Sequence, residues 1–165
     1  MSSVNRGKQF EDVVREAFEK VPGVSIDRLH DQTTGFKGSS NICDFIVYRE
    51  PYEYYFECKS VHGNTLPFRN ISATQWNGLL AKSFIEGVTA GIICWWVDKG
   101  KTAFIPIQML QAMLNHGKKS ISHEQVTFVD SCGNGYSITI IEGKKKRVFF
   151  DYAMEKFLNE IQYNG

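Results

Sequence analysis

Several features are missing from this chain of 165 residues, and each absence excludes a class of protein. No apolar run approaches the roughly 20 residues of a membrane-spanning helix, and the polar start MSSVNRGKQFED has no apolar signal core. We therefore expect no membrane partner and a cytoplasmic location. The four cysteines (Cys43, Cys58, Cys94 and Cys132) form no C-x-x-C pair, and no histidine stands at zinc-ligand spacing. The pattern therefore predicts neither a zinc knuckle nor a redox pair.

A large charge of one sign is also missing. Lys and Arg number 19 and Asp and Glu number 18, so overall charge does not indicate a nucleic-acid partner. Attraction to phosphate would have to come from local patches. The chain does have 42% hydrophobic residues, including 12 Phe, 7 Tyr and 3 Trp, and it has no long low-complexity tract. This composition and length predict one folded globular domain that spans residues 1–165.

Helical periodicity appears in four places. Apolar residues form one stripe between residues 5 and 20, with Asn5 as the expected N-cap and Pro22-Gly23 as the stop. A second helix is expected to begin near Ser72, where Ser72 and Gln75 have the S-x-x-Q spacing of a capping box. Two more helices are predicted, over residues 106–117, with Pro106 near the first helical position and Gly117 after the end, and around 151–161.

Strand patterns fill much of the remaining chain. A hairpin is predicted over residues 42–49 and 54–61, with Glu50-Pro51 at its tip, and residues 27–41 are expected to be loop or irregular strand. Further strands are expected at VTAGIICWWV, TAFIPI, VTFV, YSITII and RVFF. The order of these elements predicts a mixed α/β fold in which helices flank a central mixed sheet.

Three polar residues lie at the centre of the predicted hairpin. Asp44 is on its first strand, and Glu57 and Lys59 are on its second. Side chains two apart on a strand share a face, so Glu57 and Lys59 should point the same way and Cys58 the opposite way. A turn at Glu50-Pro51 places Asp44 within about one residue of Glu57, close enough for both carboxylates to hold one magnesium ion.

A salt-bridge cluster on a solvated sheet face is the alternative, because Asp, Glu and Lys often occur at such spacings by chance. The apolar neighbours Phe45, Val47 and Phe56 make the strands half-buried. Two nearby carboxylates in such a place repel each other unless they are protonated or bridged by a cation. The context therefore favours a metal site over a simple ion-pair cluster.

Five segments, in this order and at these intervals, resemble the RecU-type Holliday junction resolvases of the PD-(D/E)xK superfamily. They are NRGKQFED, CDFIV, FECKS, LPFRNISATQ and AGIICWWVDKGKTAFIPIQML, and the likeness runs from about residue 5 to residue 121. The resemblance implies a restriction-endonuclease-like fold and a nuclease that uses Mg²⁺, with Mn²⁺ as a possible substitute. It also implies that Asp44, Glu57 and Gln75 hold the metal and that Lys59 orients the attacking water or stabilises the transition state.

Two of the site residues have a second interpretation. Glu11 lies at the flank of the first helix's apolar stripe, where it can face the sheet, and related enzymes often place a first-helix glutamate in the metal site. It is equally the kind of acid that an early helical turn favours. For Gln75 the alternative is the capping box with Ser72, and we expect that both roles cannot be filled completely at once.

DNA contacts need local cations. Arg6, Lys8, Arg28 and Lys37 flank the predicted site in sequence and are candidates for binding phosphates, although each is equally explained as a solvated surface charge. The one dense basic run, GKKKR at residues 143–147, fits either a soluble hairpin tip or a second phosphate grip.

The prediction from these patterns is a homodimeric endonuclease that resolves four-way junctions in branched DNA by paired nicks, as two-fold symmetry suits two equivalent strands. Two departures from the family bear on it. The resolvases carry a long stalk between the first helix and the metal strand, whereas only residues 24–41 are available here, and Ile42 stands where the family tends to have threonine. A restriction-like or repair nuclease on duplex DNA or ends, and a non-catalytic DNA-binding module, remain as alternatives.

Overall fold

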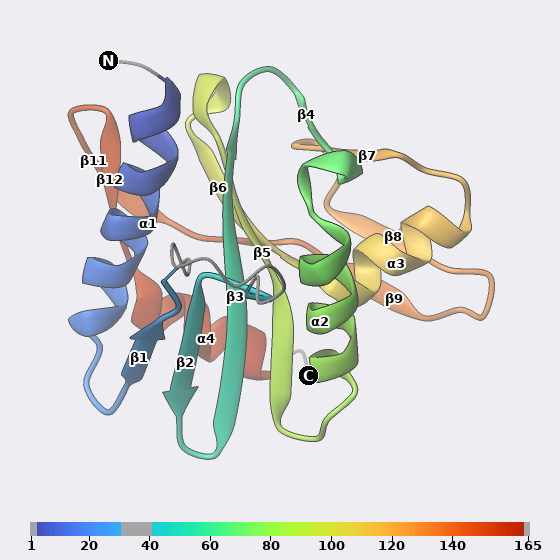
Figure 1. The fold of residues 1–165 in the computed structure, drawn as a ribbon, viewed down its shortest axis with the longest axis horizontal. Coiled ribbons are helices and arrows are strands. Elements are labelled where there is room, and N and C mark those ends of the chain that lie inside the picture. The colour runs from blue at the N-terminus through green and yellow to red at the C-terminus, as the bar shows by residue number, and fades with distance from the viewer. Residues whose placement is uncertain (1–2, 31–40, 164–165) are drawn as a thin grey trace, which may run out of the picture.

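A computed structural model describes residues 3–30 and 41–163 and has a six-stranded sheet at its centre (Figure 1). The spatial order of its strands is β1 (Ser25–Arg28), β2 (Phe45–Arg49), β3 (Tyr52–Val61), β5 (Val88–Trp96), β6 (Lys101–Pro106) and β10 (Thr139–Ile140). Strands β3 and β5 are parallel, and the other neighbours are antiparallel. The predicted class, a central mixed sheet flanked by helices, is confirmed.

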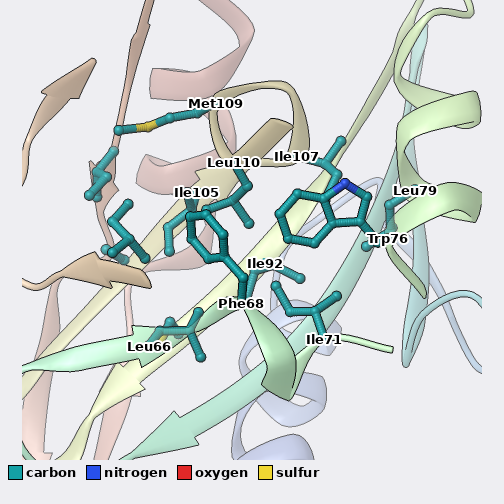
Figure 2. Close-up of a cluster of buried hydrophobic side chains, with 14 of the residues drawn as sticks. Leu66, Phe68, Ile71, Trp76, Leu79, Ile92, Ile105, Ile107, Met109 and Leu110 are labelled. Atoms are coloured by element: carbon teal, nitrogen blue, oxygen red, sulfur yellow. The ribbon is translucent and has the colours of Figure 1, made fainter. Parts of the chain in front are cut away.

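Two hydrophobic cores cover the two faces of this sheet. One core contains residues of α2 (Ala73–Ser83) and α3 (Ile107–Asn115), and Figure 2 shows its Phe68 and Trp76 lying against Ile92 and Ile105 of the sheet. The other contains residues of α1 (Ser3–Glu19) and α4 (Met154–Tyr163). Strand β3 has buried residues on both faces, as a central strand requires. This position fixes the strand that carries Glu57 and Lys59.

The predicted hairpin is present as β2 and β3. Its strands are joined at Glu50-Pro51, as expected, and that peptide bond is cis. Phe45 pairs with Phe56, so the register continues to place Asp44, just before β2, opposite Glu57. The backbone N–H of Asp44 extends this pairing by donating to the carbonyl of Phe56 at 3.1 Å.

The helix boundaries confirm some predicted caps and correct others. Ser72 and Gln75 form the predicted capping box of α2, and Gly117, with φ +83°, follows α3 as predicted. Asn5 as an N-cap is wrong, because α1 already begins at Ser3 and Asn5 therefore lies inside the helix. Pro106 is the N-cap of α3 rather than its first residue, because its extended ψ of 138° still belongs to the end of β6.

Short strands were the least predictable elements. The structure adds β1, β4 (Thr65–Pro67), β7 (Ser120–Ser122) and β11 (Gly143–Lys146), which the sequence patterns did not indicate as regular strands. The predicted strands VTFV and RVFF correspond to β8 (Thr127–Val129) and β12 (Phe149–Tyr152), and YSITII divides into β9 (Gly135–Ser137) and β10. Among the described residues, no helix has both the length and the apolar character needed to span a membrane.

Candidate active site

Asp44, Glu57 and Lys59 meet where β2 begins beside the second half of β3. The Nζ of Lys59 lies 3.0 Å from Oε2 of Glu57, so these two side chains share a face, as the period of the strand predicts. Cys58 belongs to the core on the opposite face. The structure therefore brings together the three polar residues that the hairpin pattern singled out.

Backbone groups hold Asp44 in place at the edge of the two strands. Its Oδ2 accepts a hydrogen bond from the backbone N–H of Cys58 at 2.8 Å, and its own carbonyl accepts one from the N–H of Leu29 at 2.8 Å. The first bond fixes the carboxylate against β3, and the second ties residue 44 to the chain just after β1. Asp44 is half-buried and is oriented by strands on both sides.

Glu57 is a carboxylate buried in the sheet, with only 4% of its surface exposed. Its Oε2 contacts Lys59 and also accepts a hydrogen bond from Nε2 of Gln75 at 3.0 Å. Its Oε1 is buried and has no hydrogen-bond partner within the described part of the chain. A buried carboxylate oxygen without a donor is costly, so this atom is the oxygen of Glu57 that a bound ligand could satisfy.

Glu11 of α1 completes a row of three carboxyl groups. It lies in hydrogen-bonding contact with Asp44, which in turn contacts Glu57. On its other side, Oε2 of Glu11 is 2.9 Å from the guanidinium of Arg28. The flank of the apolar stripe thus does face the sheet, and whether Glu11 takes part in catalysis stays a proposal.

Burial is the main reason that the pKa values of all three acids are raised. Burial, together with contact with Asp44, raises the pKa of Glu11 to about 7. Burial and the charge of Glu57 raise the pKa of Asp44 to about 7, and burial also raises the pKa of Glu57. The raised pKa values mean that the surroundings disfavour the charged forms of these acids, a condition that a bound cation would relieve.

This cluster should make stability depend on pH in metal-free buffer. The ordinary pKa values are 3.8 for Asp44 and 4.5 for Glu11, so between these values and about 7 the folded chain binds more protons than the unfolded chain. The free energy of unfolding therefore falls as pH rises through that window, on the order of 2–4 kcal/mol in total. Urea unfolding with chelator at about pH 5 and pH 7.5 measures this fall, which should be smaller in Asp44→Asn. Equal pH dependence in both proteins would contradict it.

Gln75 caps α2 and contacts Glu57 at the same time. Its Oε1 accepts the backbone N–H of Ser72 at 3.1 Å, and its Nε2 donates to Glu57. The two ends of one amide therefore cap the helix and contact Glu57 at the same time. Because Oε1 is engaged in the cap, Gln75 as it stands is a partner of Glu57, and its predicted role as a metal ligand stays a prediction.

A pair of variants separates the two roles of Gln75. Ser72→Ala removes the cap acceptor for the N–H of Gln75 and should lower the free energy of unfolding by about 1 kcal/mol, while the predicted nuclease activity should stay nearly unchanged. Gln75→Ala should cost similar stability and also lower activity, because Glu57 loses a donor. Denaturant unfolding and cleavage rates of both variants check this. Equal activity loss in the two variants would assign the effect to the helix alone.

The carboxylate oxygens of the cluster are the type of ligand that a hard divalent cation takes. Such ions prefer carboxylate oxygens, and these are supplied by Glu11 of α1, Glu57 of β3 and Asp44, which directly precedes β2. Within residues 3–30 and 41–163, no three acidic, histidine or cysteine side chains stand as a ready metal site. The carboxylates contact the donors of Cys58, Lys59 and Arg28, and Oε1 of Glu57 has no hydrogen-bond partner among the described residues.

The predicted DNA-contacting residues lie in different situations. Lys8 is exposed and Arg6 half-buried on the first turns of α1, whereas Lys37 lies outside the described residues. Arg28 forms ion pairs with Glu11 at 2.9 Å and with Asp12 at 2.7 Å. In this structure the guanidinium of Arg28 is therefore paired with acids at the site rather than presented to solvent for a phosphate.

The ion pair between Arg28 and Glu11 was not foreseen from the sequence. It requires β1, which runs antiparallel to β2 and brings Arg28 beside α1. A signal for this strand exists in the alternation of Val24 and Ile26 with polar residues directly after the Pro22-Gly23 turn. The segment was too short and too polar for that alternation to stand out.

The chain resembles solved structures but matches no family model and no curated protein. Among solved structures, the chain is similar to Hjc, a Holliday junction resolvase from the archaeal hyperthermophile Archaeoglobus fulgidus. The sequence identity is 20%, the TM-score is 0.48, and the match covers 79% of this chain and 95% of that chain.

Proposed function

We propose that this chain is a magnesium-dependent endonuclease that cuts the phosphodiester backbone of DNA. The observation that carries the proposal is the buried Oε1 of Glu57, which has no donor among the described residues, in a carboxyl group that contacts Asp44, which in turn contacts Glu11. A salt-bridge cluster, the alternative from the sequence, would not explain it. Lys59 and Gln75 both contact Oε2 and leave the other oxygen unsatisfied.

Asp44 and Glu57 would hold the metal ion, with Glu11 as an additional carboxylate. When bound, a divalent cation polarises the scissile phosphate and lowers the pKa of a coordinated water. The backbone N–H of Cys58 and the amide of Gln75 keep the two main carboxylates in their positions. Gln75 thus acts in this proposal as a positioning residue for Glu57.

Lys59 supplies the positive charge that the reaction needs. Its ammonium group lies on the same face as Glu57, and 20% of its side chain is exposed. A phosphate that enters from the open side of the site can therefore meet both the ammonium and the acids. In that position Lys59 would orient the attacking water or stabilise the extra negative charge of the transition state.

Branched DNA, in particular a four-way junction, is the substrate we propose. The five sequence segments that resemble the RecU-type resolvases support this choice, because they carry Glu11, Asp44, Glu57, Lys59 and Gln75 at matching intervals. A homodimer is part of the proposal, since two equivalent sites suit the two equivalent strands of a junction.

A second candidate, a nuclease for ordinary duplex DNA or ends, is favoured by one observation. Only residues 24–41 lie between the turn after α1 and the start of the metal strand, which leaves no room for the long stalk of the resolvases. Cleavage of a mobile four-way junction and of a linear duplex with the same sequence, with and without chelator, separates the two candidates. Faster, paired, chelator-sensitive nicking of the junction is expected, and equal rates would remove the resolvase assignment. Bound but uncut DNA in the presence of Mg²⁺ would instead favour a non-catalytic binding module.

A further inference from the structure

A basic hairpin that the proposed catalytic site does not use stands at one end of the molecule. It consists of β11 (Gly143–Lys146), the connecting residues Arg147 and Val148, and β12 (Phe149–Tyr152). We propose that this hairpin is a second DNA-binding element that binds the phosphates of a duplex arm. The inference rests on the proposed nuclease function. It adds a contact between the hairpin and the DNA substrate outside the proposed catalytic site.

The two strands of the hairpin have different tasks. Strand β12 anchors it, since the ring of Phe149 lies 5.4 Å from that of Trp95 and the hydroxyl of Tyr152 bonds to Thr102 at 2.7 Å. Strand β11 pairs with β12 alone, and each of its residues is exposed. The outer strand is therefore held firmly while it presents its side chains to solvent.

The exposed strand and turn present four consecutive cations. Lys144 and Lys146 lie on one face of the ribbon and Lys145 on the other, with Arg147 at the turn. Lys146 has an ion-pair partner, Asp151, at 3.6 Å, whereas the other three cations have none among the described residues. Cations on both faces of a two-stranded ribbon suit a groove with phosphates on either side, and the DNA major groove admits such a ribbon.

Arg147 supplies an independent observation. Its φ is +58°, and it is the one non-glycine residue with positive φ in the described part of the chain. Lys146 pairs with Phe149, so Arg147 and Val148 form a two-residue hairpin connection, where Gly, Asn or Asp ordinarily takes a positive φ at little cost. An arginine that keeps this conformation at a turn, with its side chain exposed, points to selection for the guanidinium.

The hairpin packs on the α1 face of the sheet, opposite the face of Glu57 and Lys59, and is linked to the proposed site through α1, which carries Glu11. Phe10, the neighbour of Glu11, packs against Trp95 at 5.4 Å, and Trp95 also contacts Phe149 of the hairpin. Figure 1 shows the hairpin pointing past α1 toward the end at which that helix begins, where Arg6 and Lys8 are found. One helical turn of duplex is about 34 Å long, which exceeds the two ring-to-ring steps that separate Phe10 from Phe149.

A protective role for the lysines is the competing explanation, because lysine on an exposed edge strand discourages pairing with other chains. The two roles predict different results. Loss of edge protection produces aggregation without changing how binding depends on salt, whereas loss of phosphate contacts lowers the salt slope by about 0.9 per contact. Edge protection also gives no reason for an arginine at a positive φ.

The test measures binding of the full chain to a four-way junction and to duplex DNA over a range of salt, with chelator to prevent cleavage. Lys144→Gln with Lys145→Gln should lower the slope of log K against log salt by about 2, and affinity near 0.1 M salt by about ten- to a hundredfold. The control, Lys82→Gln with Lys156→Gln, removes the same charge from α2 and α4 and should leave the slope within about 0.5 of the parent.

Arg147→Gly separates binding from folding. Glycine accepts a positive φ, so this variant should melt at the same temperature as the parent or higher, yet its slope should fall by about 1. Slopes equal to those of the control would overturn the hairpin assignment, whether or not the variants aggregate. If the variants have the control's slopes but the parent still binds DNA, the proposed nuclease function stands without the hairpin. A parent that binds neither the junction nor the duplex would overturn both the nuclease proposal and the hairpin proposal.

Discussion

Asp44→Asn and Glu57→Gln are each expected to reduce the rate of DNA cleavage by about a thousandfold or more, while DNA binding stays within about threefold. A catalytic metal contributes several kcal/mol to the transition state, and each 1.36 kcal/mol is tenfold in rate. Both substitutions keep the size of the side chain, and an Asn oxygen can still accept the Cys58 N–H that Asp44 accepts now. Single-turnover cleavage of a labelled junction, with binding measured in parallel, provides the test.

A matched control for these variants lies on the same strand. Glu53→Gln alters an acid of β3 on the same face as Glu57, four residues away and bonded to the hydroxyl of Tyr55. It should cleave at the parent's rate. Metal-free Glu57→Gln should also be at least as stable as the parent, because a neutral amide relieves a buried charge. Cleavage surviving in both Asp44→Asn and Glu57→Gln would remove the site assignment.

Lys59→Met should lower cleavage by about a hundred- to a thousandfold without abolishing metal binding. The ammonium is proposed to stabilise charge that develops in the transition state, and removing one such donor has an effect of this size. Lys59 contacts Oε2 of Glu57, so its removal leaves Oε1, the proposed metal ligand, untouched. Rates at saturating Mg²⁺, together with a metal titration, separate the loss of charge from the loss of the ion.

Lys99→Met is the control for general electrostatic attraction, since Lys99 is an exposed lysine in the turn that follows β5. Its cleavage rate should stay within about threefold of the parent at moderate salt. A similar loss in both lysine variants would show that long-range charge, and not the position of Lys59, supports the reaction.

The sequence predicted the arrangement at the centre of the site because strand geometry is local. A period of two and a turn at Glu50-Pro51 suffice to place Asp44 opposite Glu57 and Lys59 beside Glu57, and the structure has both. The capping box at Ser72 was equally local. Each of these predictions depended on residues fewer than 20 apart along the chain.

Contacts between elements that are distant or weakly patterned were not predictable. The ion pair between Arg28 and Glu11 depends on the short strand β1, and the double role of Gln75 depends on how α2 approaches β3. The protonation state of the acids depends on burial, which no spacing reveals. Tertiary packing decides these features, and a sequence pattern reports only which face of an element is apolar.

A calorimetric titration of the protein with Mn²⁺ tests the central claim most directly, because it needs neither substrate nor cleavage. The account predicts saturable binding by the parent, by Glu53→Gln and by Lys59→Met, and loss of that binding when Asp44→Asn and Glu57→Gln are combined. Equal Mn²⁺ binding by the parent and the combined variant, or no binding by the parent, would contradict a metal site formed by these two strands.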